Sequence, residues 1–364
     1  MQDRYITDEA KVNISSLEAE TVMKSTPVST VTSILGRIGI EYEEGLPKEA
    51  YIAAFKEEFC SEPKWVLLML PKMMLDFLME VWENPVVEMS EERWNYVEYL
   101  KIFGFLAYRM GNSISDEPNQ ILVVDEMKDR FYFLLKSRKS QKALSVYEEW
   151  EKIITGYMYY YGFIETRTLY SLFLKVSKKV VSYEEFILFI KCRSSMWAFG
   201  AILKDFTGKN EYFQYLSVEN ADLLLTYIRE HEELPYKPVK IEDLIYVSDA
   251  AGIDNRWSGV NELGNLFIDK MGLNYYRATV LLRTLLIMIK NGCSYDKLQE
   301  RLSGLPFKNK ELEEETRQAV GQLFESVPVF EYKGYSREEY KRLSHQKQLK
   351  KRKNLFTIID GGRE

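Results

Sequence analysis

Histidine and cysteine are scarce in this chain of 364 residues, which contains two histidines and three cysteines. His231 and His345 lie in different predicted segments, which excludes a metal site built on two histidines, such as HExxH. Cys60, Cys192 and Cys293 form no CxxC pair, so the sequence predicts neither a disulfide framework nor a zinc site. We therefore expect no metal, no other cofactor and a reducing, cytoplasmic location.

The sequence motifs of several catalytic and nucleotide-binding sites are also absent. The chain has no GxSxG, GxxxxGKS/T or GxGxxG sequence and no EF-hand loop. Asp125, Glu126 and Asp129 stand at a predicted helix start, where carboxylates usually complement the helix dipole. We expect a protein without enzymatic activity.

Long hydrophobic runs and an excess of basic charge are missing as well. The most apolar helix candidate, ATVLLRTLLIMI, is twelve residues long and contains Arg283, so it is too short for a bilayer. The first residues, MQDRYITDEAK, lack the basic and apolar regions of a secretory signal. The formal net charge of -6 gives no general attraction to nucleic acid or to an anionic membrane. We expect no membrane partner.

Hydrophobic residues make up 46% and aromatic residues 14% of the chain, which is enough for packed cores in two or three domains. The patterning predicts a mainly α fold with small β-hairpins, in which tandem winged-helix-like units precede an all-helical C-terminal module. The expected segments are a partly helical leader (1–45), a helical, winged-helix-like unit (46–140), a winged-helix-like domain (141–233), the all-helical module (234–335), and a basic C-terminal helix and tail (336–364).

The segment 141–233 carries the clearest order of elements. A helix from about Val146 to Tyr161 precedes a short strand, a helix that Thr166 could cap, and a helix that begins with an S-x-x-E capping box at Ser182. A β-hairpin around the turn TGKN follows. This order resembles a winged-helix domain, a fold that serves both DNA binding and protein interaction. Residues 47–136, where helices precede two short strands, resemble it too.

The stretch SVPVFEYKGYSREEY, residues 326–340, resembles the tail of a set of uncharacterised bacterial proteins. In that set an apolar-Pro-apolar stretch precedes a GxSxxE helix start, sometimes ahead of a SEC-C metal-binding motif. This chain has no such cysteine-rich motif, so the resemblance does not imply zinc binding.

The third helix of the winged-helix-like domain is the element that normally enters the DNA major groove. With Phe186, Ile187 and Ile190 toward a core, its opposite side carries Glu184, Glu185, Leu188, Phe189 and Cys192. An apolar strip with acidic neighbours favours contact with a protein over contact with phosphates. Leu188 and Phe189 are therefore candidate partner-binding residues.

Four tyrosines cluster in GYMYYYG, residues 156–162. Tyr157 and Tyr161 share the apolar face of the predicted helix and are expected in a core, with each hydroxyl bonded to a partner or at the surface. Tyr160 falls at the edge of that face, and Tyr159 points nearly opposite it. Tyr159 is the third candidate partner-binding residue.

We therefore predict a protein-interaction or regulatory scaffold that binds a protein partner or itself. The alternative is a DNA-binding transcriptional regulator that uses the winged helix and the basic tail. Its candidate nucleic-acid-binding residues are Lys191, Arg193, Lys204, Lys209, Lys350, Lys351, Arg352 and Lys353. The basic tail is also explained by a solvated helix, or by pairing with the acidic helix at 309–325.

Overall fold

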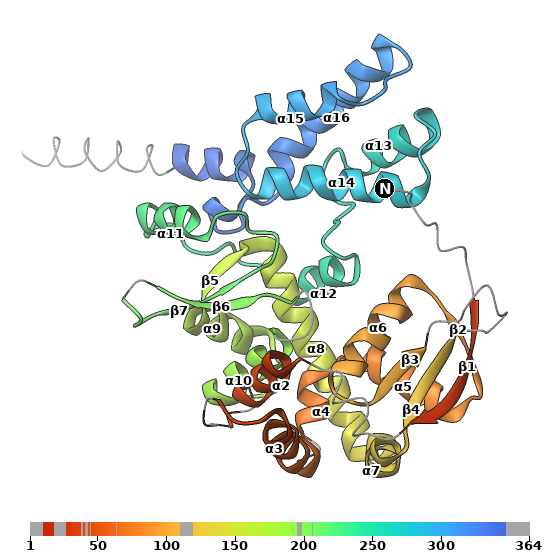
Figure 1. Ribbon diagram of the computed structural model, residues 1–364. Helices are drawn as coiled ribbons and strands as arrows, with labels where there is room; N and C mark the ends of the chain where they lie inside the picture. Colours follow the sequence, from red (N-terminus) through yellow and green to blue (C-terminus); the bar gives the residue numbers. More distant parts are fainter. Residues whose placement is uncertain are drawn as a thin grey trace, which may run out of the picture. The chain divides into compact units, whose positions relative to one another are not determined.

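The computed structural model describes residues 10–17, 27–37, 39–40, 43, 45–62, 64–109, 119–194, 199–205 and 207–346. These residues form mainly helices with two small sheets, which confirms the expected fold class at that level (Figure 1). The chain divides into two compact units, each built from two stretches of sequence. Unit 1 comprises Met1–Trp150 and Val181–Phe199, and unit 2 comprises Glu151–Val180 and Gly200–Glu364.

The helices of unit 1 begin and end at the local signals that the sequence carries. Its helices are α2 (Val28–Arg37), α3 (Lys48–Ser61), α4 (Lys64–Met69), α5 (Lys72–Glu83), α6 (Glu91–Ile102), α7 (Asp125–Lys136), the first part of α8 (Arg138–Tyr161), and α10 (Tyr183–Ser194). Pro71 separates α4 from α5. Ser90 caps α6 by accepting a hydrogen bond from the backbone N–H of Arg93 at 3.2 Å. Gly104, at φ 73°, follows the end of α6.

The sheet of unit 1 has four strands in the order β2-β1-β4-β3. The strands are β1 (Ala10–Leu17), β2 (Val86–Met89), β3 (Leu106–Arg109) and β4 (Gln120–Val124). The antiparallel pair β3–β4 confirms the predicted hairpin. The leader contains helix α2, but it also carries a strand that the sequence did not predict: β1 lies inside this sheet, parallel to β4 and antiparallel to β2. Helices α5, α6 and α7 contact β2, β3 and β4, respectively (Figure 1).

Unit 2 combines a three-stranded antiparallel sheet with a helical module. The sheet has the order β5-β7-β6, and its strands are β5 (Phe163–Glu165), β6 (Ala201–Lys204) and β7 (Glu211–Gln214). Strands β6 and β7 form the predicted hairpin. The helices are the end of α8, α9 (Thr166–Val176), α11 (Ala221–Glu230), α12 (Ile241–Asp249), α13 (Val260–Asn265), the π-helical turn η1 (Leu266–Lys270), α14 (Tyr275–Lys290), α15 (Tyr295–Ser303), α16 (Lys310–Ser326) and the short turn η2 (Phe330–Tyr332).

The predicted winged-helix-like domain is divided between the two units. Its helix α9 and its hairpin belong to unit 2, whereas α10, the expected third helix, belongs to unit 1 and contacts α4. The order α8-β5-α9-α10-β6-β7 along the chain is the expected one. The winged-helix assignment therefore stays a prediction.

The tyrosine-rich end of α8 is packed in unit 2. Tyr157 and Tyr161 are 2% and 0% exposed, as expected of core residues. Their hydroxyls donate hydrogen bonds to the backbone oxygens of Leu172, at 3.1 Å, and Lys237, at 2.6 Å. Helix α8 ends before Gly162, at φ 65°. It begins at Arg138, earlier than the predicted start near Val146.

Residues 327–340, after α16, contact parts of unit 2 that are distant in sequence. We call this stretch the closing segment. Phe330 packs so closely on Gly162 that an added Cβ there would lie 2.5 Å from the ring. The Lys333 ammonium donates to the backbone oxygens of His231 and Leu234, at 2.8 and 2.9 Å. Arg337 donates to the backbone oxygens of Phe324 and Cys293, at 3.2 and 3.1 Å.

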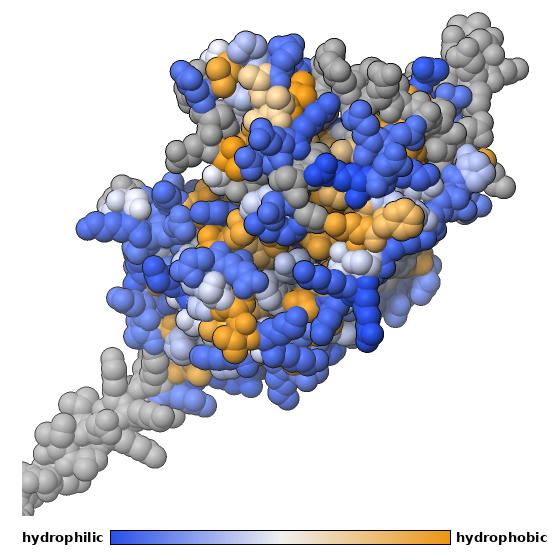
Figure 2. Space-filling view, turned by 90° about the horizontal axis from the view of Figure 1, so that it is seen from below, coloured by the Kyte–Doolittle hydropathy of each residue, from blue (hydrophilic) through white to orange (hydrophobic). Residues whose placement is uncertain are grey.

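The surface of the described residues is mainly polar, with apolar side chains between the charged ones, as Figure 2 shows for one face. A few large apolar side chains are strongly exposed, among them Phe133 at 80% in unit 1 and Tyr275 at 78% in unit 2. None of the helices among these residues has the length and apolar character needed to cross a membrane.

Candidate protein-interaction site

The apolar strip that the sequence predicted on α10 is not a surface. Phe189 is 0% exposed and packs against Tyr147, Trp150 and Phe199, with ring centroids 5.5, 5.5 and 6.3 Å away. Cys192 is also 0% exposed, and Leu188 is half-buried. The prediction that Phe189 faces outward is wrong because α10 is covered on a second side, by the aromatic side chains of Tyr147 and Trp150 on α8.

The candidate nucleic-acid-binding residues fall at buried, exposed and undescribed positions of the chain. Arg193 is 1% exposed, with its guanidinium carbon 5.5 Å from the centre of the Phe189 ring, so its predicted reach toward solvent is wrong. Lys191, Lys204 and Lys209 are exposed, the first on α10 and the others on the β6–β7 hairpin. Lys350, Lys351, Arg352 and Lys353 lie outside the described residues.

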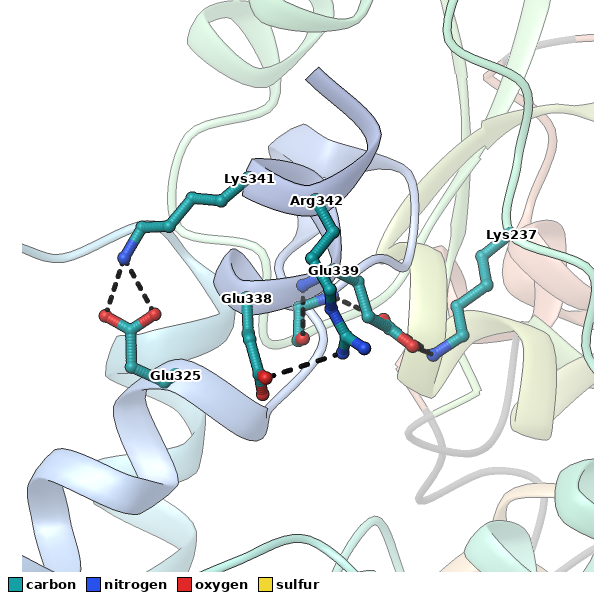
Figure 3. A network of polar contacts seen from close by, with 7 residues as sticks. Lys237, Glu325, Glu338, Glu339, Lys341 and Arg342 are labelled. Carbon is teal, nitrogen blue, oxygen red and sulfur yellow. Dashed lines mark hydrogen bonds and ion pairs between the residues drawn. The ribbon is translucent and has the colours of Figure 1, made fainter. Parts of the chain in front are cut away.

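Two ion pairs join the described part of the basic C-terminal helix to other parts of unit 2 (Figure 3). Residues 337–346 are helical, and Ser336 and Glu339 form the predicted capping box, with N–H to side-chain distances of 2.9 and 3.3 Å. Lys341 donates to both carboxylate oxygens of Glu325 on α16, at 3.0 and 2.9 Å. In the second pair the acid lies on the helix: Lys237, from the segment before α12, donates to both oxygens of Glu339, at 2.7 and 2.8 Å. The sequence indicated pairing with the acidic helix at 309–325 as an alternative to nucleic-acid binding. The Lys341–Glu325 pair is a contact of that kind.

Helix α14 leaves an apolar face uncovered. Asn274 caps the helix by accepting a hydrogen bond from the N–H of Arg277 at 2.9 Å. The core side of α14 is almost fully buried and consists of Ala278, Leu282, Leu285, Leu286 and Ile289. On the opposite side Tyr276, Val280, Arg283 and Ile287 recur at i, i+4, i+7 and i+11, so they share one face. All four are exposed, and we call them the α14 face.

A cavity of about 180 Å³, which we call the Tyr159 pocket, adjoins the α14 face. Its lining residues are Tyr159, Tyr215, Ser217, Ala251, Gly252, Arg283, Leu286, Ile287 and Lys290. Arg283 and Ile287 belong both to the α14 face and to this lining, so the pocket continues the face. The lining includes two basic residues, Arg283 and Lys290, and no carboxylate.

Tyr159 forms a wall of the pocket and does not point freely outward. It is half-buried, and its ring meets the Tyr215 ring edge-on, with the centroids 5.2 Å apart. The ring also lies against Gly252, where an added Cβ would be 2.3 Å from Tyr159 Cε1. Tyr159 is therefore partly covered where the sequence predicted an outward side chain, because the loop after α12 lies against its ring.

Lys290 is buried beside the pocket and holds the end of α8. It is 4% exposed, and its ammonium donates a 2.7 Å hydrogen bond to the backbone oxygen of Tyr159. The same nitrogen lies 4.7 Å from the Trp257 ring centre and 5.4 Å from that of Tyr159. Burial lowers the pKa of Lys290 to about 7, and nearby Asp254 opposes this shift. A cation here also complements the C-terminal end of the α8 dipole.

A second cavity, of about 400 Å³, lies beside the turn between α14 and α15. Asn291 holds this turn to the loop after β7: it accepts from the N–H of Glu219 at 2.9 Å and donates to the oxygen of Ser217 at 2.8 Å. The lining carboxylates Glu219 and Glu331 form no cluster suited to a metal. The described parts of the chain bring no three His, Cys, Asp or Glu side chains together in such a cluster.

Comparison of the chain with protein-family models, with curated proteins and with solved structures found no match. The resemblances of residues 141–233 to a winged helix and of residues 326–340 to a bacterial tail segment stay predictions.

Proposed function

We propose that this protein is a non-enzymatic interaction scaffold that docks a protein partner on the α14 face. The observation that carries the proposal is an uncovered apolar helix face that runs into a pocket. Tyr276 is 69% exposed, Val280 45% and Ile287 37%, and Tyr275 beside them is 78% exposed. Contiguous apolar side chains of this kind mark interaction sites more often than single exposed ones do.

The composition of the α14 face supports a protein partner. Tyrosine and arginine are the residue types most enriched among the side chains that dominate binding energy at protein interfaces. A helix face with anchors at i, i+4, i+7 and i+11 also suits the packing of a second helix. The predicted docking surface on α10 is thus replaced by one on α14, and the predicted class of function is retained.

Selection of random peptides on the full-length chain tests this proposal. Enriched peptides are expected to bind the unchanged protein and to lose roughly tenfold or more in affinity with Tyr276→Glu or Val280→Glu. Phe133→Glu is the matched control, because it places the same charge at an exposed aromatic position of α7, in unit 1. The proposal fails if no peptide is enriched, or if the enriched peptides tolerate both α14 changes.

DNA binding by a winged helix is the second candidate function. The order α8-β5-α9-α10-β6-β7 and the exposed Lys204 and Lys209 on the β6–β7 hairpin support it. The burial of Arg193 and the acidic start of α10 weigh against it.

A salt titration with mixed-sequence duplex DNA separates the two candidates. DNA binding predicts an affinity that falls steeply with salt, and a loss of roughly tenfold at low salt for the double change Lys204→Glu and Lys209→Glu. The scaffold proposal predicts no such binding, and the unchanged protein is then indistinguishable from the double variant.

A further inference from the structure

We infer that the Tyr159 pocket takes an aromatic anchor side chain of the docked partner, and that Arg283 at its rim pairs with a carboxylate next to that anchor. This inference rests on the proposed docking function and specifies the chemistry of the partner. The occupant is a segment of another protein in which an aromatic residue neighbours an acidic one.

The walls of the pocket suit an aromatic ring. Tyr159 and Tyr215 present ring surfaces, already edge-on to each other, and Leu286 and Ile287 supply aliphatic surface. An entering ring can add to this pair in the offset or edge-on arrangements that aromatic side chains prefer. Gly252, at φ 85°, leaves the room in which the Tyr159 ring lies, so the shape of this wall depends on a glycine.

The charges around the pocket favour a carboxylate over a cation. Arg283 is exposed, and no hydrogen bond or ion pair joins it to the rest of the described chain. Other arginines of unit 2 are matched with acids: Arg256 with Asp243 and Asp254, and Arg317 with Glu313. Arg283 also opposes the rise that burial produces in the pKa of Tyr215, which places its charge toward the pocket.

A partner carboxylate at the rim would meet a guanidinium whose donors are available. Charge-assisted hydrogen bonds of this kind are about twice as strong as neutral ones, and arginine can form two of them with one carboxylate. Because no acid lines the pocket to balance the charge of Arg283, an acidic anchor is attracted and a basic one is repelled.

Binding of 3-phenylpropionate to the full-length chain, followed by saturation-transfer NMR, tests this inference, since the probe carries one aromatic ring and one carboxylate. We expect millimolar binding, weakened roughly tenfold by Arg283→Gln. The uncharged 3-phenylpropanamide is expected to bind the unchanged protein about as weakly as the acid binds the variant. Arg301→Gln, at an exposed arginine of α15 outside the pocket, is the matched control and is expected to have no effect.

The inference is overturned if the acid binds Arg283→Gln unchanged, if the amide binds as well as the acid, or if neither probe binds. These results are distinct from failure of the docking function. If enriched peptides need Tyr276 but not Arg283, the proposed docking on the α14 face holds and the proposed anchor in the Tyr159 pocket is wrong. If the probe binds in an Arg283-dependent way but no peptide binds the α14 face, the pocket is a small-ligand site and the proposed docking function is wrong.

Discussion

Replacing Gly156 by alanine is expected to lower the free energy of unfolding by about 1–3 kcal/mol. Helix α8 passes so close to α12 at this point that an added Cβ would lie 2.4 Å from the Leu244 oxygen and 2.7 Å from its Cα. Both atoms are backbone, so the contact is relieved only if α8 and α12 move apart. Leu244, which is 0% exposed, would move with it.

The same substitution at Gly264 is expected to have the opposite sign. Gly264 lies in α13, and an added Cβ there meets no atom within 4 Å. Alanine should therefore raise the free energy of unfolding by about 0.5–1 kcal/mol, because it favours the helix and restricts the unfolded chain. Urea denaturation of both variants, followed by circular dichroism, measures the pair. Equal effects of the two changes would contradict the close approach of α8 and α12.

Between about pH 7 and about pH 9.5 the free energy of unfolding is expected to rise with pH because of Lys290. In the folded chain its pKa is lowered to about 7, whereas the ordinary value for lysine is about 10.4. Within this window the unfolded chain holds a proton that the folded chain has lost. At low pH, proton binding to Lys290 favours the unfolded state, and raising the pH weakens this effect. The free energy of unfolding therefore rises with a slope that approaches about 1.4 kcal/mol per pH unit.

Lys290→Met should remove this part of the pH dependence while retaining a long side chain. Lys297→Met, at an exposed lysine of α15, is the matched control and should leave the slope unchanged. The window ends below pH 10 because buried tyrosines act in the opposite direction: burial raises the pKa of Tyr157 to about 12, so the unfolded chain loses that proton first. Urea denaturation at several pH values measures the slopes, and equal slopes for unchanged protein and Lys290→Met would refute the prediction.

The helix boundaries that follow from local chemistry were predictable from the sequence. Ser90, Ser336 and Asn220 cap helices because their side chains reach a backbone N–H two or three residues ahead, or pair with a nearby glutamate. Gly162 ends α8 because glycine adopts a positive φ without strain. These causes act within one turn of chain, so residue type and spacing reveal them.

The burial of Phe189 and Arg193 was not predictable in the same way. A helical wheel assumes one core face, but α10 is covered on more than one side by Tyr147, Trp150 and α4. Those neighbours are remote in sequence, and nothing in the α10 segment itself indicates them.

Strand β1 was missed for a related reason. Its parallel register, Asn13 opposite Gln120, joins positions separated by most of unit 1. Parallel pairing leaves no turn sequence between the partners, so the usual hairpin signal does not exist.

Of the candidate site, the sequence indicated the helix and one residue of the pocket, Tyr159. The sequence predicted that residues around 275–290 form an apolar helix, and α14 confirms this. It did not reveal that Tyr276, Val280 and Ile287 stay uncovered, since their apolar character is also that of a core. The Tyr159 pocket brings together α8, α14 and the loops after β7 and α12, and such convergence follows from tertiary packing alone.

The closing segment has a consequence for the order in which the protein can fold during synthesis. The Lys333 hydrogen bond to His231 joins residues 102 positions apart, and Lys237 is equally far from Glu339. Unit 2 therefore cannot complete its packing until the ribosome has made residue 340. Unit 1 must also wait, because it needs Val181–Phe199. Both units remain open for much of translation, a period in which unpaired apolar surface favours aggregation and calls for chaperones.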